Sequence, residues 1–263
     1  MSFLRAAVWS ITAVLATYYV AVVLVVLKSA PLRDPVTIVL CMAVGFMVTL
    51  FFMLLAQERE HSLSQVLGFR RTNGWLYILG IGLGVALQAP LGLVSELTQK
   101  LFPLTEEARS AMEAFRDVST WQRKVALLVA AGIVGPVVEE VFFRGGIFRG
   151  LRRAHSAALT LLGMSLLFAA AHLDPGNALP DFLGGLAMGY VRIMSGSIWP
   201  GILVHMAFNS TTVVQLIRSG PEGPVSTLQL ALSMALTIAM VVIFRAIAAR
   251  SERCAQAREQ DLA

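Results

Sequence analysis

Long, nearly uncharged apolar stretches recur along this chain and limit the folds that it can adopt. A helix needs about 20 residues to cross a hydrocarbon core of about 30 Å. Windows of about this length occupy residues 7–27, 36–56, 75–97, 125–149, 157–173, 179–195, 198–217 and 225–247. Hydrophobic residues make up 57% of the 263 positions and charged residues 14%, against roughly 45–50% and 25% in soluble domains. The sequence predicts an all-α, polytopic integral membrane protein with about eight transmembrane helices, forming a single membrane domain over residues 1–263.

Basic residues border these windows unevenly and indicate an orientation. If both termini lie on one side of the membrane, that side receives most of the flanking Lys and Arg residues. Because loops rich in Lys and Arg stay in the cytoplasm, we expect cytoplasmic termini and a multi-pass protein of the cell membrane. Residues 251–263 read as a charged, solvated tail. The net charge of +5 follows from these flanks, so the lipid bilayer is an expected partner and nucleic acid is not.

Two adjacent glutamates, Glu139 and Glu140, interrupt the fourth window. An ionisable side chain at the centre of a membrane helix costs about 2.5–3.5 kcal/mol, so it is a functional-site hypothesis by default. Arg144 lies four residues after Glu140 on the same helix face, which predicts an ion pair and leaves Glu139 as the freer carboxylate. Pro136 lacks an N–H and is expected to loosen this turn and admit water.

Two histidines and an asparagine follow in later windows: His172, then His205 with Asn209 one helical turn after it. At 1.5 Å per residue, Glu139 and His172 each lie about 20 Å from the turn between their helices, so a helical hairpin would place them level. His205 lies only about 11 Å from the turn that precedes its helix. A recessed turn, a tilted helix or a different boundary would remove this difference in depth.

These residues form three ordered motifs, each without a substitution. The motifs are Glu-Glu-x-x-x-Arg (Glu139, Glu140, Arg144), Phe-x-x-x-His (Phe168, His172) and His-x-x-x-Asn (His205, Asn209). Their pattern resembles the type II CAAX prenyl endopeptidase family, also called CPBP intramembrane proteases or the Abi family. The resemblance covers residues 125–217, which we expect to form the catalytic core. It implies hydrolysis of a peptide bond within or at the edge of the membrane, near the C-terminus of a substrate protein with a membrane anchor or a lipid.

Peptide hydrolysis needs a general base that activates water and donors that stabilise the oxyanion. Glu139 with His172 suits the first task, and His205 with Asn209 suits the second. The expected supporting residues are Glu140 and Arg144, as a buried ion pair, and Phe168, as a packing residue.

A zinc-dependent version of the same protease uses these groups differently. Glu139 or Glu140 would bind the metal with His172 and His205, and the remaining glutamate would act as the base. The His-Glu-x-x-His motif of zinc proteases is absent, and Asn209 would be a poor zinc ligand. We therefore favour the metal-free mechanism and keep zinc as the alternative cofactor.

Two alternatives from other functional classes remain open. In a proton-coupled transporter, Glu139, His172 and His205 would relay protons or bind an ion. In an immunity or binding protein, the glutamates would only hold helices together. For a protease, the charge bias places Glu139 nearer the membrane face opposite the termini, which favours exported substrates with C-terminal anchors. The segment 105–121 is amphipathic with mixed charge and is expected to form a solvated helix; a helix on the membrane surface or a cover over the site are the alternatives.

Overall fold

The computed structural model describes residues 1–27, 34–57, 62–103, 106, 109–110, 113, 120–219 and 226–261. Its α-helices are α1 (Phe3–Val26), α2 (Pro35–Gln57), α3 (Leu63–Leu67), α4 (Gly74–Ala86), α5 (Gln88–Leu101), α7 (Trp121–Val129), α8 (Gly135–Glu140), α9 (Phe148–Arg152), α10 (Ala157–Ala171), α11 (Ala178–Ser195), α12 (Trp199–Ser219) and α13 (Thr227–Asp261). Two π-helical segments, η1 (Ala130–Val134) and η2 (Val141–Ile147), lie within the stretch from α7 to α9. The predicted all-α architecture of a polytopic membrane protein is confirmed.

Five helical stretches among the described residues are long and apolar enough to cross a membrane. They are Phe3–Val26, Pro35–Ala56, Gly74–Leu101, Trp121–Arg152 and Thr227–Ser251. The helices α10, α11 and α12 occupy the other three predicted windows but do not belong to this set. The predicted count of eight spans is therefore not established, although each window contains a helix.

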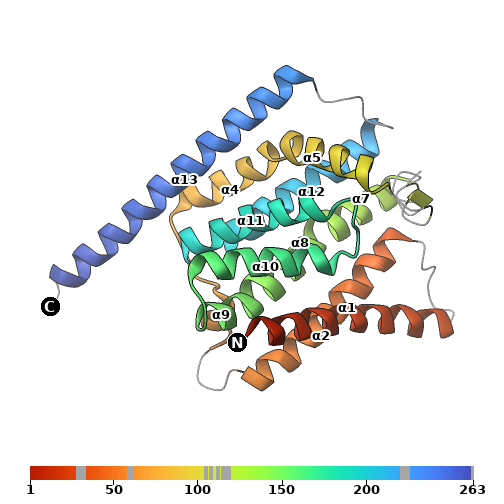
Figure 1. The fold of residues 1–263 in the computed structure, drawn as a ribbon, viewed down its shortest axis with the longest axis horizontal. Coiled ribbons are helices and arrows are strands. Elements are labelled where there is room, and N and C mark those ends of the chain that lie inside the picture. Colours follow the sequence, from red (N-terminus) through yellow and green to blue (C-terminus); the bar gives the residue numbers. More distant parts are fainter. Residues whose placement is uncertain are drawn as a thin grey trace.

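The fourth window lies at the centre of the bundle. Within its most apolar part, 56% of residues are buried, against 11% for α1 and 6% for α13. Figure 1 shows α8, α10, α11 and α12 between the pair α1 and α2 on one side and α4, α5 and α13 on the other. Large apolar side chains are exposed along α1 and α13. Such surfaces suit contact with lipid, because a soluble protein rarely exposes apolar patches of this extent.

The third window, residues 75–97, lies within one candidate membrane span, Gly74–Leu101, but the helix is interrupted within it. Helix α4 ends before Leu87 and α5 begins after it. Pro90 has no N–H to donate to Ala86, four residues earlier. The Ala86 carbonyl instead accepts hydrogen bonds from Ser233 Oγ at 2.6 Å and Thr237 Oγ1 at 3.2 Å. The Ala86 carbonyl, which Pro90 leaves without an N–H donor, thus attaches α13 to the bundle.

Pro136 has a related effect in the fourth window. The N–H of Gly135 donates to Ala130 O, five residues earlier, as in a π-helix. The next bond of this type would run from residue 136 to Ala131, but proline has no donor. Ala131 O accepts instead from Asn209 Nδ2 of α12 at 3.2 Å. Pro136 was expected to admit water at this turn, but a side chain of the neighbouring helix takes the released carbonyl.

Glycines allow α4 to approach α12 closely. A Cβ atom on Gly84 would collide with the backbone oxygen of Val204, and one on Gly80 would lie 2.9 Å from the backbone oxygen of Pro200. The spacing small-x-x-x-small permits such backbone contact between membrane helices. This contact fixes the height of α12, the helix that carries His205.

Both chain ends lie at the same end of the bundle as α9 (Figure 1). The amino group of Met1 donates to Gly150 O at 2.6 Å, and Asn73, before α4, contacts Ser251 of α13 at 3.4 Å. The termini therefore share one side, while the cytoplasmic assignment of that side stays a prediction. The expected tail at 251–263 is helical as far as Asp261. Most of the segment 105–121 lies outside the described residues.

Candidate active site

The ion pair predicted between Glu140 and Arg144 is present and completely buried. Arg144 Nη1 lies 2.8 Å from Glu140 Oε1, and both side chains are 0% exposed. Arg144 Nη2 donates to the backbone oxygen of Gly185 at 3.1 Å, which ties the pair to α11. His205 Nδ1 also lies 3.1 Å from Glu140 Oε1. Glu140 is thus held by two cationic or polar partners from two helices.

Glu139 is the freer carboxylate, as its position on the helix predicts. Its Oε2 atom is buried and has no hydrogen-bond partner among the residues that the structure describes. This oxygen lies 3.9 Å from His172 Nε2 and 3.8 Å from His205 Nε2. The structure therefore brings Glu139 and both histidines to one place.

The difference in depth expected for His205 is removed by a recessed turn. Ser197 and Ile198, between α11 and α12, are both 0% exposed. Ile198 N donates to Gly68 O at 3.0 Å, and Ser197 Oγ donates to Arg70 O at 2.5 Å. The connection between α3 and α4 thus covers this turn, so α12 begins inside the bundle rather than at its surface.

Hydrogen bonds assign the protons of both imidazoles. His172, at the C-terminal end of α10, has Nδ1 2.9 Å from Phe168 O. A carbonyl only accepts hydrogen bonds, so Nδ1 carries the proton and the Nε2 lone pair faces Glu139. His205 repeats this arrangement, because its Nδ1 lies 3.1 Å from Glu140 Oε1. The two Nε2 atoms and Glu139 Oε2 therefore face a common space.

Phe168 packs between the charged and the imidazole parts of the site. Its ring centroid lies 4.7 Å from that of His172 and 5.8 Å from that of His205. The guanidinium carbon of Arg144 lies 4.5 Å from the same centroid, a cation–π contact. Phe168 is 3% exposed, so it can fix the orientation of both rings through packing.

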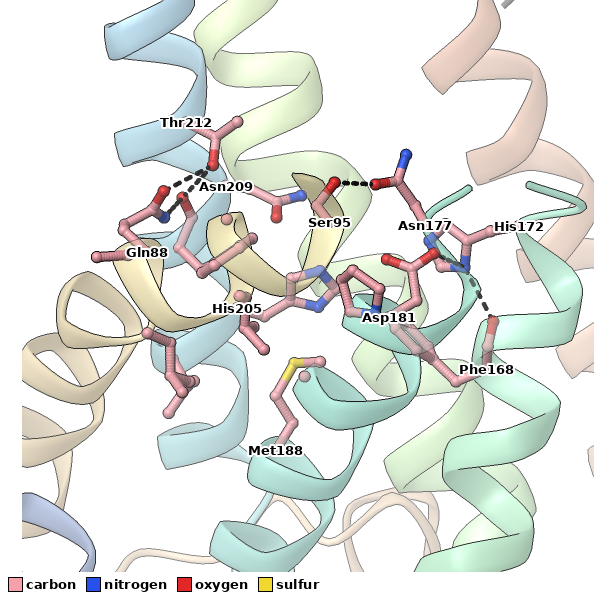
Figure 2. Close-up of a pocket in the computed structure, with 18 of the residues that line it drawn as sticks. Gln88, Ser95, Phe168, His172, Asn177, Asp181, Met188, His205, Asn209 and Thr212 are labelled. Atoms are coloured by element: carbon pink, nitrogen blue, oxygen red, sulfur yellow. Dashed lines mark hydrogen bonds and ion pairs between the residues drawn. The ribbon is translucent and has the colours of Figure 1, made fainter. Parts of the chain in front are cut away.

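A cavity of about 520 Å³ opens onto Glu139, His172 and His205. Further polar lining residues are Gln88, Ser95, Asn177, Asp181, Thr212, Gln215 and Gln229. Figure 2 shows His205, His172 and Asp181 around this cavity, with Asn209 and Thr212 farther along α12. Gln229 belongs to the first turns of α13 and Gln215 to the last turns of α12. The cavity therefore extends toward the bundle end opposite the termini.

None of these seven polar lining residues was singled out from the sequence, and two of them, Gln88 and Asp181, contact the helices of the site. Gln88 Nε2 donates to Phe208 O at 2.7 Å, and its Oε1 accepts from Thr212 Oγ1 at 3.2 Å. Asp181 Oδ2 lies 3.9 Å from His172 Nδ1. Asp181 could have been found from the sequence, because an ionisable residue within a predicted membrane span is by default a functional-site candidate. Gln88 has a weaker signal, a polar residue two positions before a proline.

Asn209 lines the cavity and is anchored to the π-helical segment η1. One amide hydrogen on Nδ2 is used by Ala131 O. An amide group has two donor hydrogens, so one remains for a group in the cavity. The next residue, Ser210, donates to Gly132 O at 3.2 Å. These two bonds fix the register between α12 and the helix that carries Glu139.

The donor set of the site suits zinc in chemistry but not in spacing. Zn–N bonds of about 2.0–2.1 Å place neighbouring ligands of a tetrahedral site about 3.3 Å apart. Glu139 Oε2 is 3.8 Å from His205 Nε2 and 3.9 Å from His172 Nε2. Within the part of the chain that the structure describes, no group of three or more His, Cys, Asp or Glu side chains has the arrangement of a metal site. The side chains as they stand do not fit a closed zinc centre.

Comparisons with known proteins identify the region that carries the site. Residues 121–211 match the family model described as "Type II CAAX prenyl endopeptidase Rce1-like". A Bacillus subtilis (strain 168) protein, "Putative membrane peptidase YdiL", is 24% identical over 127 residues, which are 48% of this chain and 51% of that protein. The chain thus matches about half the length of this curated relative, and no solved structure matches. Residues 121–211, the part of the chain that carries the site, are thus similar to the Rce1-like type II CAAX prenyl endopeptidases.

Proposed function

We propose that this protein is an intramembrane endopeptidase that cleaves a membrane-anchored or lipidated protein near its C-terminus. The observation that carries the proposal is Glu139 Oε2, a buried oxygen without a described hydrogen-bond partner that faces the Nε2 atoms of two histidines. Such an oxygen is costly to bury unless something in the cavity binds it. A water molecule, the second substrate of hydrolysis, meets this need.

In the first step, Glu139 acts as the general base. A water that donates to Glu139 Oε2 and His172 Nε2 would lie about 2.8 Å from each, which is compatible with their separation of 3.9 Å. Glu139 takes one proton, and the hydroxide adds to the carbonyl carbon of the scissile bond. Glu139 then returns this proton to the nitrogen of the leaving amine. The C–N bond breaks to give a carboxylic acid and an amine, and the acid proton passes to the amine, so the final products are a carboxylate and an ammonium group.

His205 and Asn209 stabilise the oxyanion formed by this addition. When His205 is protonated, Nδ1 donates to Glu140 and Nε2 donates to the oxyanion. Glu140 Oε1, 3.1 Å from Nδ1, stabilises the imidazolium form. The second amide hydrogen of Asn209 is the other donor.

The buried pair of Glu140 and Arg144 has an electrostatic role in this scheme. Arg144 supplies the counter-charge of Glu140 at 0% exposure, where a carboxylate without a partner is costly to bury. Glu140 in turn orients His205, because Nδ1 of His205 lies 3.1 Å from Glu140 Oε1. Both residues therefore support the reaction without touching the substrate.

The cavity suits a polypeptide that enters from the membrane. Apolar lining residues, among them Leu87, Leu91 and Phe208, alternate with amide and hydroxyl groups. Apolar walls accept a membrane anchor or a lipid, and polar groups accept an extended backbone. The cavity extends away from the termini, so with cytoplasmic termini the substrates would be exported proteins that carry a C-terminal anchor.

Membrane proteomics of the natural host would test this proposal. We would compare cells with the wild-type protein and cells with Glu139→Gln, and search for a membrane protein that keeps its C-terminus only in the variant. Glu96→Gln is the matched control, since Glu96 is an exposed glutamate of α5 outside the cavity lining. Identical C-termini in all three strains, with the variant present at wild-type abundance, would contradict a protease.

The zinc alternative has a separate test, because the donor set of Glu139, His172 and His205 suits the metal chemically. We propose the metal-free mechanism, since the oxygen-to-nitrogen separations exceed those of a closed zinc site. Purified protein should retain its cleavage activity after chelation and dialysis, with far less than one zinc per chain by mass spectrometry of the metal content. Activity that disappears on chelation and returns with zinc would favour the metalloprotease.

A further inference from the structure

A second cavity, of about 510 Å³, lies at the end of the bundle that carries the termini. Five arginines line it: Arg70, Arg149, Arg152, Arg153 and Arg192. Among the described residues that line it, none is acidic. Its charge is therefore opposite to that of the candidate active site, and neither the motifs nor the proposed reaction uses it.

Three chain connections meet at this cavity. Arg70 follows α3, Arg152 ends α9, Arg153 follows it, and Gly196 follows α11. These connections lie at the end of the bundle that carries the termini. The arginines thus lie at the ends of apolar helices, where basic side chains of membrane proteins meet anionic headgroups.

Arg192 forms the buried wall of the cavity. It is 8% exposed, its Nε donates to Arg144 O at 3.2 Å, and its guanidinium carbon lies 4.6 Å from the ring centroid of Phe148. The backbone bond and the stacked ring hold the guanidinium plane in one orientation. Its two terminal nitrogens have no acceptor among the described residues, so their hydrogens remain available to a ligand.

Gly68 makes room for this guanidinium. It caps α3 in the left-handed region, with φ of 79°. A Cβ atom here would collide with Nη2 of Arg192. The absence of a side chain at Gly68 thus lets the chain turn and gives the arginine head its space. A fixed cationic group in a shaped recess differs from the mobile Arg and Lys side chains that usually flank membrane spans.

The guanidinium groups of Arg70, Arg152 and Arg192 around one recess create a positive potential. Concave, poorly solvated surfaces concentrate such a field and attract anions. Arginine presents paired N–H donors whose spacing matches the oxygens of a phosphate group. The recess is also large enough for a small polar headgroup, since ligand sites range from about 300 to 1,000 Å³.

We propose that this cavity binds a phosphate-bearing anion at the membrane surface. Arg192 supplies a fixed donor pair at the back, and the exposed Arg70 and Arg152 approach from the front. The phosphate belongs either to an anionic lipid headgroup or to free phosphate, which present the same oxygens to the arginines. The place of these arginines at the ends of apolar helices favours the lipid.

The proposal can be tested with the full-length protein in a neutral detergent. The probes are a short-chain phosphatidylglycerol, the diacylglycerol with the same chains but no phosphate, and inorganic phosphate. Thermal unfolding is followed as each probe is titrated. We expect phosphatidylglycerol to raise the midpoint temperature saturably and the diacylglycerol to leave it unchanged. Saturable stabilisation by inorganic phosphate at comparable concentration would identify free phosphate as the source, and its absence would identify the lipid.

Arg70→Gln and Arg152→Gln locate the site. Both side chains are exposed, so these changes should not prevent folding. Each should weaken phosphatidylglycerol binding by about tenfold, because a charge-assisted hydrogen bond to phosphate is lost. Arg71→Gln is the matched control, an exposed arginine next to Arg70 that does not line the cavity. Equal binding by all three variants and the wild type, or no saturable effect of either phosphate-bearing probe, would overturn the proposal.

Discussion

The two halves of the candidate active site differ in how their charges are satisfied. The closed half, Glu140 with Arg144, is 0% exposed and forms a direct ion pair of 2.8 Å. In the open half, Glu139 Oε2 has no hydrogen-bond donor among the described residues and faces a cavity, whereas Glu140 lacks a partner only on Oε2 and is bound through Oε1. The two glutamates are adjacent in sequence, yet they point to different faces of one helix. Adjacent carboxylates can thus have different tasks, one neutralised to hold structure and one kept for chemistry.

His205 connects the two halves through its two ring nitrogens. Nδ1 lies 3.1 Å from Glu140 in the closed half, and Nε2 lies 3.8 Å from Glu139 in the open half. The closed half therefore sets the tautomer of a residue that acts in the open half. Changes to the two halves should separate into losses of activity and losses of stability.

The largest effect is expected for Glu139→Gln, which removes the base but keeps the shape. Cleavage should fall by about 10³-fold, within the range for loss of a general base. The free energy of unfolding should change little, because Oε2 of Glu139 has no protein donor to lose. Cleavage of an identified substrate by reconstituted protein measures the first effect, and thermal unfolding in detergent measures the second. A variant that unfolds easily would place Glu139 in the closed half.

Arg144→Met should mainly reduce stability. It leaves Glu140 buried without its counter-charge, which costs about 3 kcal/mol of unfolding free energy. The double variant Glu140→Gln with Arg144→Met should recover part of this loss, since no isolated charge remains. Unfolding curves of the single and double variants provide the comparison. Strictly additive losses would show that the two residues do not act as a pair.

Asn209→Ala tests whether one residue both stabilises the oxyanion and holds two helices together. Loss of an oxyanion donor should lower cleavage by about 10²-fold, and loss of the bond to Ala131 O should lower the unfolding free energy by about 1 kcal/mol. Ser210→Ala is the matched control, because it removes the neighbouring bond to Gly132 O at a similar cost in stability. Equal rates for the two variants would restrict Asn209 to holding helices together.

The smallest effect is expected at the exposed ion pair of Asp34 and Arg123, whose charged atoms lie 2.9 Å apart. Burial raises the pKa of Asp34, but hydrogen bonds from Arg123 and Thr37 outweigh it, so this pKa lies below its ordinary value. A lowered pKa adds stability above the unfolded-state value, and this contribution is lost as the pH falls through the native value. Asp34→Asn should therefore cost about 0.5 kcal/mol at neutral pH and nothing in strong acid. Unfolding midpoints at both pH values test this contrast with the closed half.

The ordered motifs predicted which polar side chains lie near one another within a helix, because helical spacing determines which residues share a face. Four residues separate Glu140 from Arg144, so the ion pair follows from one turn of helix. The residues that connect helices were harder to predict. The hydrogen bond from Asn209 to Ala131 O forms because the π-helical segment and Pro136 together leave this carbonyl unpaired. Neither feature indicates from the sequence which residue will donate to it. Gln88 and Asp181 enter the cavity only because α5 and α11 pack beside α12.

By itself the sequence determined the class of molecule, the order of its helices and the identity of the ionisable residues within them. These properties follow from local hydrophobicity and from the 3.6-residue period, which need no knowledge of the partner helices. The tertiary structure decided the depth of His205, the break at Leu87 and the meeting of five arginines at one recess. Each of these features depends on how segments that are distant in sequence pack together. A recessed turn needs a loop that covers it, a released carbonyl needs a donor from another helix, and a glycine contact needs a helix that approaches it.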